Sequence, residues 1–269
     1  MLLCVAQPAQ RQRLLVAYVG QHGPTAERQQ RVIRRSWTSM QTEYPRWSLR
    51  CVLATGGMRV QQFVVHGPDQ CSELSLSTPS RGALQRGETV HRLLLWLGSG
   101  GAGVPAFEFL LKAELSTLVC FGMVTDLLDA VQLRFGEPAH ASRAGLGGSR
   151  IYLGQVETCT RVAHAGLVRK GDELVDASFL EDVMQRKDAT CYPPYMHRLG
   201  YVLGGALVNE IARMGRLGTL RIYENDDVMV GTWLVGHQVH RARMVAKEYL
   251  DMWYQTCVPR ANPKPLSLC

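Results

Sequence analysis

Short, continuous apolar runs alternate with amphipathic stretches over the first part of the chain. Leu14–Val19 contains no charged residue and ends at Gly20, a pattern typical of a strand buried on both faces of a parallel sheet. Thr25 then offers an N-cap for a helix that runs to about Trp37. With a second apolar run at 49–54, this alternation predicts a layered α/β fold.

The same alternation continues further along the chain. The turn Tyr192–Tyr195 is stiffened by Pro193 and Pro194 and is predicted to lead into an apolar helix. A turn-rich stretch is predicted to form a surface loop over 66–82. The other predictions are helices over 88–97 and 119–131, strands over 107–112 and 151–153, and either a strand or part of a helix at 60–65.

No linker divides the sequence into separate units. The glycine-rich stretch at 98–103 is short, and the apolar elements on both sides of it are expected to share one sheet. We therefore expect residues 1–269 to form a single domain, with a core over about 13–245 and a C-terminal extension over 246–269.

The composition is typical of a folded globular domain, with 46% hydrophobic and 20% charged residues among 269. The longest apolar runs, such as 93–97, are too short to cross a bilayer. The apolar segment at 1–6 ends at Gln7 and Pro8, so it is too short for the hydrophobic region of a signal peptide. We expect neither an anchor nor a signal peptide within this sequence.

The chain is basic, with a formal net charge of +7. Its arginines are spread along the sequence, and their local density rises only around 28–35. No basic stripe is interleaved with aromatic residues, so nucleic acid is not an expected partner. The positive charge suits a diphosphate ligand equally well.

The eight cysteines show no Cys-x-x-Cys spacing, which argues against a structural zinc site. His237 and His240 lie three residues apart but are too few to hold zinc alone. An even number of cysteines permits disulfides, and reduced core cysteines remain equally open.

Asp226 and Asp227 stand directly before an apolar segment that begins at Val228. A carboxylate held by a neighbouring charge in a low-dielectric site can act as a general base. The same pair is typical of a helix N-terminus. Both roles are compatible, because a helix end would fix the position of the carboxylate.

Several basic residues permit either phosphate binding or a solvated role. Arg31, Arg34 and Arg35 share one predicted helix, where arginine forks suit phosphate but a charge run is also typical of a solvated face. Lys112 follows a strand and is open to the same two interpretations.

Five segments in sequence order resemble those of glycosyltransferase family 31, the β-1,3-galactosyl- and N-acetylglucosaminyltransferases. The resemblance covers roughly residues 13 to 245, and the C-terminal half is most similar to members that extend the proteoglycan linkage region. The matching segments are Arg31–Trp37, Phe107–Lys112, Ile151–Gly154, Cys191–Leu203 and Glu224–Gly231.

The resemblance implies a GT-A-type nucleotide-sugar-binding domain with a mixed, mostly parallel central sheet flanked by helices. The implied reaction is inverting transfer of galactose or N-acetylglucosamine from UDP-galactose or UDP-N-acetylglucosamine to the 3-hydroxyl of an acceptor glycan, in the Golgi lumen. Members are usually held in the Golgi membrane by an anchor that this chain does not show.

The resemblance also implies roles for individual residues. Asp227 would be the catalytic base, with Asp226 as its support. The implied donor-binding residues are Arg34, Lys112, Glu114, Ser116 and Arg198, and the implied acceptor-binding residues are Tyr192, Tyr195, Gly200 and Tyr201.

Some positions depart from the family pattern. The family holds Mn²⁺ with an aspartate triad, whereas this chain has Glu114, Leu115 and Ser116, which imply a weak metal site at Glu114 and Ser116. Arg198 replaces a glycine, and Ala206 replaces an aspartate. The alternative is therefore a catalytically decayed member that binds a sugar nucleotide or a partner protein.

Overall fold

The structure is a computed structural model of the 269-residue chain. No helix of the part that it describes is long and apolar enough to span a membrane. The residues it describes are 12–21, 23–44, 47–58, 62–64, 70–78, 84–100, 103–104, 107–135, 149–158, 192–223, 225–243 and 250–252.

An eight-stranded mixed sheet forms the centre of the molecule, in the order β3-β4-β2-β1-β5-β8-β7-β9. Neighbouring strands run parallel from β4 to β5, and β8 is antiparallel to both of its neighbours. The strands of this sheet are β1 (Gln12–Gln21), β2 (Trp47–Met58), β3 (Gln62–Val64), β4 (Ser72–Ser77), β5 (Phe109–Glu114), β7 (Ile151–Glu157), β8 (Tyr195–Gly204) and β9 (His240–Arg243), while β6 (Thr117–Val119) and β10 (Leu250–Met252) form a separate antiparallel pair.

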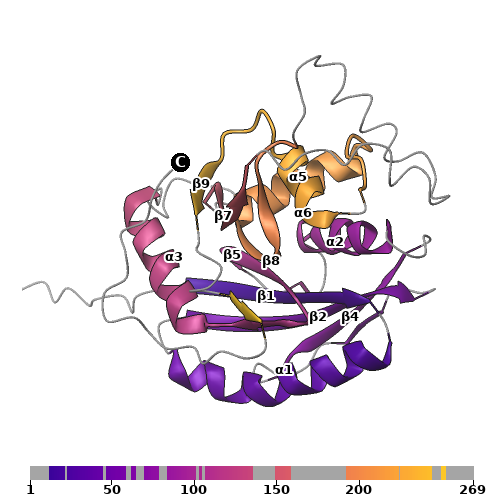
Figure 1. The fold of residues 1–269 in the computed structure, drawn as a ribbon, viewed down its shortest axis with the longest axis vertical. Coiled ribbons are helices and arrows are strands. Elements are labelled where there is room, and N and C mark those ends of the chain that lie inside the picture. The colour runs from indigo at the N-terminus through magenta and orange to yellow at the C-terminus, as the bar shows by residue number, and fades with distance from the viewer. Residues whose placement is uncertain are drawn as a thin grey trace, which may run out of the picture.

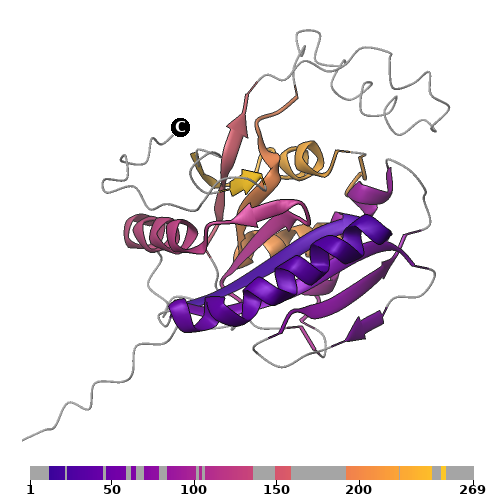
Figure 2. The same ribbon diagram turned by 60° about the horizontal axis from the view of Figure 1, so that its bottom comes forward.

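Helices cover both faces of the sheet. In Figure 1, α1 (Pro24–Glu43) lies below β1 and β2, while α2 (Leu84–Leu97), α5 (Gly205–Arg216) and α6 (Asp226–Trp233) lie on the opposite side of these strands. Figure 2 shows α1 running along β1 on its own face of the sheet. Helix α3 (Phe121–Phe135) packs on the same face as α1, where Phe121 meets the Trp37 ring edge-on. The expected central, mostly parallel sheet flanked by helices is thus confirmed.

The apolar run of β1 is buried on both faces, as its lack of alternation predicts. Leu14, Val16 and Tyr18 belong to the core beneath α1 and α3. The alternate positions of the strand, including Leu15 and Ala17, belong to the core beneath α2, α5 and α6. A central strand of this kind stabilises both layers at once, since burial of each large aliphatic side chain contributes about 1.5–3 kcal/mol.

Two predictions of local structure are wrong. The segment after the Pro193–Pro194 turn is the strand β8, and a helix begins only at Gly205. Its side chains alternate between the two cores, with Val202 on one side and Leu203 on the other, and a short apolar run cannot be assigned by periodicity alone. The predicted loop at 66–82 contains β4, whose Leu74 and Leu76 are fully buried.

The first helix and the third strand differ less from expectation. Helix α1 begins at Pro24 after Gly23, and no side chain caps it, so Thr25 lies within its first turn. The ambiguous segment at 60–65 contains the short strand β3.

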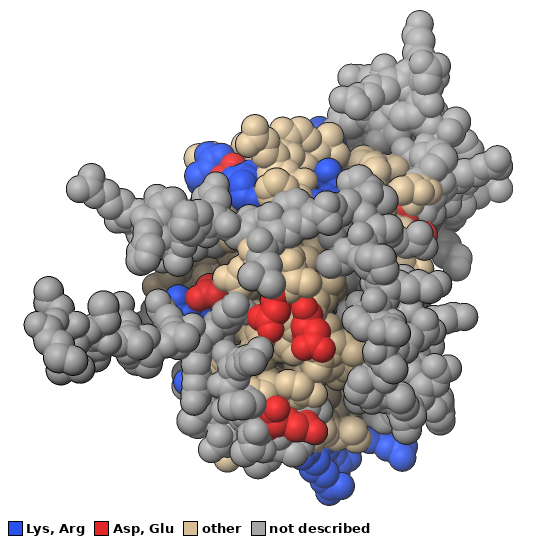
Figure 3. Space-filling model, turned by 90° about the vertical axis from the view of Figure 1, so that its left-hand side faces the viewer, with Lys and Arg blue, Asp and Glu red and all other residues tan. Residues whose placement is uncertain are grey.

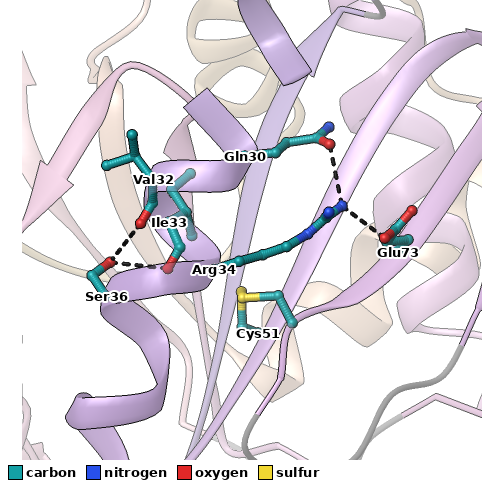
Figure 4. The surroundings of a disulfide bond; sticks show 8 residues. Gln30, Val32, Ile33, Arg34, Ser36, Cys51 and Glu73 are labelled. Carbon is teal, nitrogen blue, oxygen red and sulfur yellow. Dashed lines mark hydrogen bonds and ion pairs between the residues drawn. A yellow bond between two sulfur atoms is a disulfide. The ribbon is translucent and has the colours of Figure 1, made fainter. Parts of the chain in front are cut away.

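A disulfide joins Cys51 of β2 to Cys71, next to β4 (Figure 4). The two cysteines are 20 residues apart in sequence, and the bond holds β4 beside β2. Between the two alternatives left open for these cysteines, the structure therefore has the oxidised one.

Removing this disulfide should destabilise the protein. We expect Cys51→Ser combined with Cys71→Ser to lower the free energy of unfolding by about 3 kcal/mol, because a closed loop of this length restricts the unfolded chain. Urea denaturation without reductant measures the loss. Adding reductant should lower the stability of the parent more than that of the double variant, and equal stability of the two proteins would contradict the expectation.

Candidate functional site

A cavity of about 360 Å³ lies at the carboxyl ends of the parallel strands β1 and β5. Ligands of open α/β sheets bind at this edge, because loops and helix N-termini meet there. The loop after β1 and the first turns of α1 and α2 complete its walls. Its lining residues are Val19, Gly20, Gln21, Gly23, Pro24, Thr25, Ala26, Gln29, Arg86, Thr89, Lys112, Glu114, Leu115 and Ser116.

The cavity floor is shaped by the close approach of β1 and the end of β5. The Leu115 amide donates to the Val19 carbonyl over 3.1 Å, which continues the parallel pairing past Glu114. A β-carbon on Gly20 would collide with the Leu115 side chain. Leu115 is consequently buried, and it is directed toward β1 instead of toward a ligand.

Lys112 lies beneath the cavity as a buried cation. Its Nζ is 2.5 Å from Asp226 Oδ2, and each of the two side chains is only 1% exposed. The separation makes a close ion pair, although its angles are not those of a hydrogen bond. The same Nζ lies 5.3 Å from the centre of the Tyr201 ring. Two charges removed from water stabilise the fold only while they stay paired.

Asp227 follows Asp226 in the first turn of α6 and is 8% exposed. Burial raises the pKa of Asp227, and the negative charge of Asp226 raises it further. The Val228 amide, which donates to Asp227 Oδ1 over 2.9 Å, opposes this rise, as does the charge of Lys112. Asp227 is thus a carboxylate of increased basicity, held by its own helix end.

Two buried tyrosines lie within electrostatic range of the carboxylates. The Tyr152 and Tyr201 rings meet edge-on with centres 5.7 Å apart, and the Met196 amide donates to the Tyr152 hydroxyl over 3.1 Å. Burial raises the pKa of both phenols, so they remain neutral beside Asp226 and Asp227. Within the described part of the chain, the Tyr201 hydroxyl and Asp226 Oδ1 have no hydrogen-bond partner.

The residues at the end of β5 do not fit a divalent cation. Glu114 supplies one carboxylate, and the Ser116 hydroxyl lies at 3.5 Å from Glu114 Oε2, where it donates to that oxygen. Leu115 has no ligand atom, and its side chain is buried. Among the described residues, no group of three His, Cys, Asp or Glu side chains could hold a metal. Hard cations need several oxygen ligands, so this donor set is too small.

Arg34 lies away from this cavity. Its guanidinium is 2.7 Å from the Glu73 carboxylate of β4 and also contacts Gln30, as Figure 4 shows beside Cys51. Arg34 and Glu73 line a separate polar hollow of about 440 Å³ between α1 and the β2–β4 edge. The structure therefore brings Lys112, Glu114 and Ser116 to one cavity and Arg34 to another.

The residues expected to bind an acceptor lie along and before β8. Tyr201 and Gly200 are buried within the sheet, paired with Lys112 and Ala113, so the Tyr201 hydroxyl is not exposed to an acceptor. Tyr195 is 7% exposed and packs against Gly231 of α6. Tyr192 is half-buried. Arg198 belongs to β8, and its side chain lies outside the described residues.

The sequence did not reveal Arg86, Thr89 or Gln29 as cavity residues. Arg86 lies in the first turn of α2, in a stretch that carries no motif. Its place beside the cavity depends on the close packing of α2 against the segment before α6, which no local pattern records.

Figure 3 shows charged side chains of both signs among the described residues on one face of the molecule. Several acidic side chains lie near the middle of this face, while Lys and Arg side chains are visible mainly at its upper left and lower edge.

Breaking the buried ion pair should be costly. We expect Lys112→Met to lower the free energy of unfolding by roughly 3–5 kcal/mol, because the Asp226 charge would stay buried without its cation. Replacing both partners, with Lys112→Met and Asp226→Leu, should recover most of the loss, which a double-mutant cycle from urea denaturation measures. Arg213→Met removes an exposed ion pair with Glu210 and should change little. Lys112→Met with the same stability as the parent would disprove the energetic coupling of Lys112 with Asp226.

Asp227 should make the stability of the protein depend on pH. Its folded-state pKa is raised above the ordinary 3.8, so its contribution to stability is fully present below pH 3.8 and is lost as pH rises through the raised pKa. Asp227→Asn should therefore be more stable than the parent at pH 7, with an advantage that shrinks on acidification. Urea denaturation across this range measures it, with the exposed Asp126→Asn on α3 as the matched control. A variant less stable than the parent at pH 7 would contradict this sign.

A scan against protein-family models finds no match for this chain, and a search of curated protein sequences finds none either. The cavity and the buried carboxylates, together with the motifs of the sequence, are therefore the basis for a functional assignment.

Proposed function

We propose that this protein is an inverting, UDP-sugar-dependent hexosyltransferase with a GT-A-type domain. It would move galactose, or N-acetylglucosamine, from its UDP derivative to the 3-hydroxyl of an acceptor glycan. The donor nucleotide would occupy the cavity at the ends of β1 and β5, and the acceptor would approach the start of α6.

One observation carries the proposal: Lys112 lines the cavity and also pairs with Asp226, the neighbour of the carboxylate that the sequence resemblance assigns as the base. The candidate donor site and Asp227 are thus joined through one buried contact. Asp227 does not line the cavity itself. This separation suits an inverting transfer, in which the proton leaves the acceptor on the side opposite to the departing nucleotide.

The chemistry that Asp227 would perform follows from its environment. Its carboxylate would take the proton of the acceptor hydroxyl while that oxygen bonds to the anomeric carbon of the sugar. The bond from this carbon to the diphosphate would break, and UDP would leave with the electron pair. A pKa raised by burial and by Asp226 makes the carboxylate a stronger base for this step.

The Cys51–Cys71 disulfide supports an oxidising compartment, because such bonds persist in secretory compartments and are rare in the cytosol. The Golgi lumen implied by the sequence resemblance is such a compartment. The proposal therefore includes glycosylation within the secretory pathway.

A second candidate is a non-catalytic module that binds a sugar nucleotide. The reduced donor set at Glu114 and Ser116 favours it, and so does the burial of the Tyr201 hydroxyl. The two candidates differ in turnover and agree on binding of UDP.

Asp227→Asn should separate binding from turnover. With UDP-galactose and a panel of galactoside and N-acetylglucosaminide acceptors, we expect the rate of UDP release to fall about a hundredfold to ten-thousandfold, as for loss of a positioned base. UDP affinity, measured by calorimetry, should stay close to that of the parent. The parent rate should also fall as pH drops through the raised pKa of Asp227, since the base must be deprotonated.

Asp126→Asn is again the control and should keep the parent rate. Activity of Asp227→Asn within twofold of the parent would remove Asp227 from the mechanism. Binding of UDP with no turnover by the parent on any acceptor would favour the second candidate.

A further inference from the structure

We propose that Arg86 holds the diphosphate of the donor, so that the cavity binds its nucleotide without a divalent cation. This inference rests on the proposed function, because it concerns the same cavity. It names a ligand class, a diphosphate ester, and a residue that none of the sequence motifs includes.

The charges around the cavity lead to this assignment. Among the described residues that line it, the charged side chains are Arg86, Lys112 and Glu114. The charge of Lys112 is already matched by Asp226 at 2.5 Å, so it has little left to offer a phosphate. Arg86 has no hydrogen bond or ion pair with any of the described residues, and it is partly buried. Of the cations that the structure describes at this cavity, Arg86 is therefore the one that is still available to a ligand.

The position of Arg86 is built into the packing of α2. A β-carbon on Gly87 would collide with the carbonyl of Tyr223, and one on Gly56 would collide with the Thr89 hydroxyl. These two glycines let the first turns of α2 lie directly against β2 and against the segment that leads to α6. Arg86 is consequently carried on a rigid helix turn. A guanidinium presented in this way can bind two phosphate oxygens at once.

The opposite wall provides further donors. Gly23, Pro24, Thr25 and Ala26 at the start of α1 all line the cavity, and no side chain caps this helix. The amides of a first turn carry partial positive charge and are suited to phosphate oxygens. In Figure 1, α1 lies below β1 and β2 and α2 lies on the opposite side of these strands, so the two helices approach the cavity from opposite faces.

The donor set at the end of β5 agrees with this arrangement. A single carboxylate, with a serine where the family pattern has aspartate, is too little to hold a metal between protein and diphosphate. A diphosphate next to Glu114 still needs compensating positive charge, and Arg86 provides it from the facing helix.

Calorimetry on the full chain tests this proposal, with EDTA or with added Mn²⁺. The probes are UDP, inorganic pyrophosphate and uridine. We expect the parent to bind UDP with the same affinity in EDTA as with Mn²⁺. Arg86→Gln should lower the affinity for UDP and for pyrophosphate roughly tenfold to a hundredfold. The UDP affinity of Arg86→Lys should lie between those of the parent and Arg86→Gln, and the affinity for uridine should be the same in all three proteins. Arg92→Gln, on the same helix but outside the cavity lining, is the matched control and should bind like the parent.

The outcomes separate this inference from the proposed function. UDP affinity of Arg86→Gln within twofold of the parent, or binding that needs Mn²⁺, overturns the role of Arg86 and leaves the transferase proposal standing. A parent that binds neither UDP nor pyrophosphate overturns both. Metal-free binding that depends on Arg86, without transfer to any acceptor, supports the inference and refutes only the catalytic part of the proposed function. Thermal unfolding midpoints equal to that of the parent verify that the variants are folded.

Discussion

The buried ion pair between Lys112 and Asp226 is the constraint on which the candidate site depends. It joins the central strand β5 to the first turn of α6, and both side chains are removed from water. An unpaired charge at either position would be strongly unfavourable, so the pair fixes how α6 meets the sheet. Because Asp226 must be directed inward, the next residue, Asp227, stays at the boundary of the core with a raised pKa. Burial at this position is the main cause of the raised pKa of Asp227, and the negative charge of Asp226 adds to it.

The change of strand direction at β8 makes this pairing possible. β1 and β5 are parallel and end at the cavity, whereas β8 runs back beside β5 and places Tyr201 opposite Lys112. The ring of Tyr201 lies against the cation, and Gly231 lets α6 pack closely on Tyr195 of the same strand. Because α6 packs on the antiparallel strand β8, its first carboxylate, Asp226, can reach Lys112 on the neighbouring strand β5. The cavity and the carboxylate pair share Lys112 for this topological reason.

The sequence predicted the elements whose signal is local. β1 follows from an uninterrupted apolar run and α3 from a longer segment in which apolar residues predominate, and Asp227 was expected at the start of a helix. β4 was missed because its polar, serine-rich positions resemble a turn, although Leu74 and Leu76 alternate with them into the core. The pairing of Lys112 with Asp226, and the approach of Arg86 to the cavity, join segments that are distant in sequence. Such contacts are set by the packing of helices on the sheet, and no spacing along the chain encodes them.

The two sides of Lys112 differ in charge. On the cavity side of Lys112, Arg86 is the available side-chain cation among the described residues, and uncapped amides begin α1. On the other side, Asp226 and Asp227 place two carboxylates against one lysine. One side is thus suited to hold an anion, and the other is suited to accept a proton. The ion pair of Lys112 with Asp226 lies between the two sides, so the positive charge of the first does not suppress the basicity of the second. A group transfer in which a diphosphate leaves and a hydroxyl is deprotonated needs this polarity. The relation between the two sides favours the proposed transferase most strongly, because an arginine without a partner among the described residues, or a buried aspartate, is by itself compatible with simple binding.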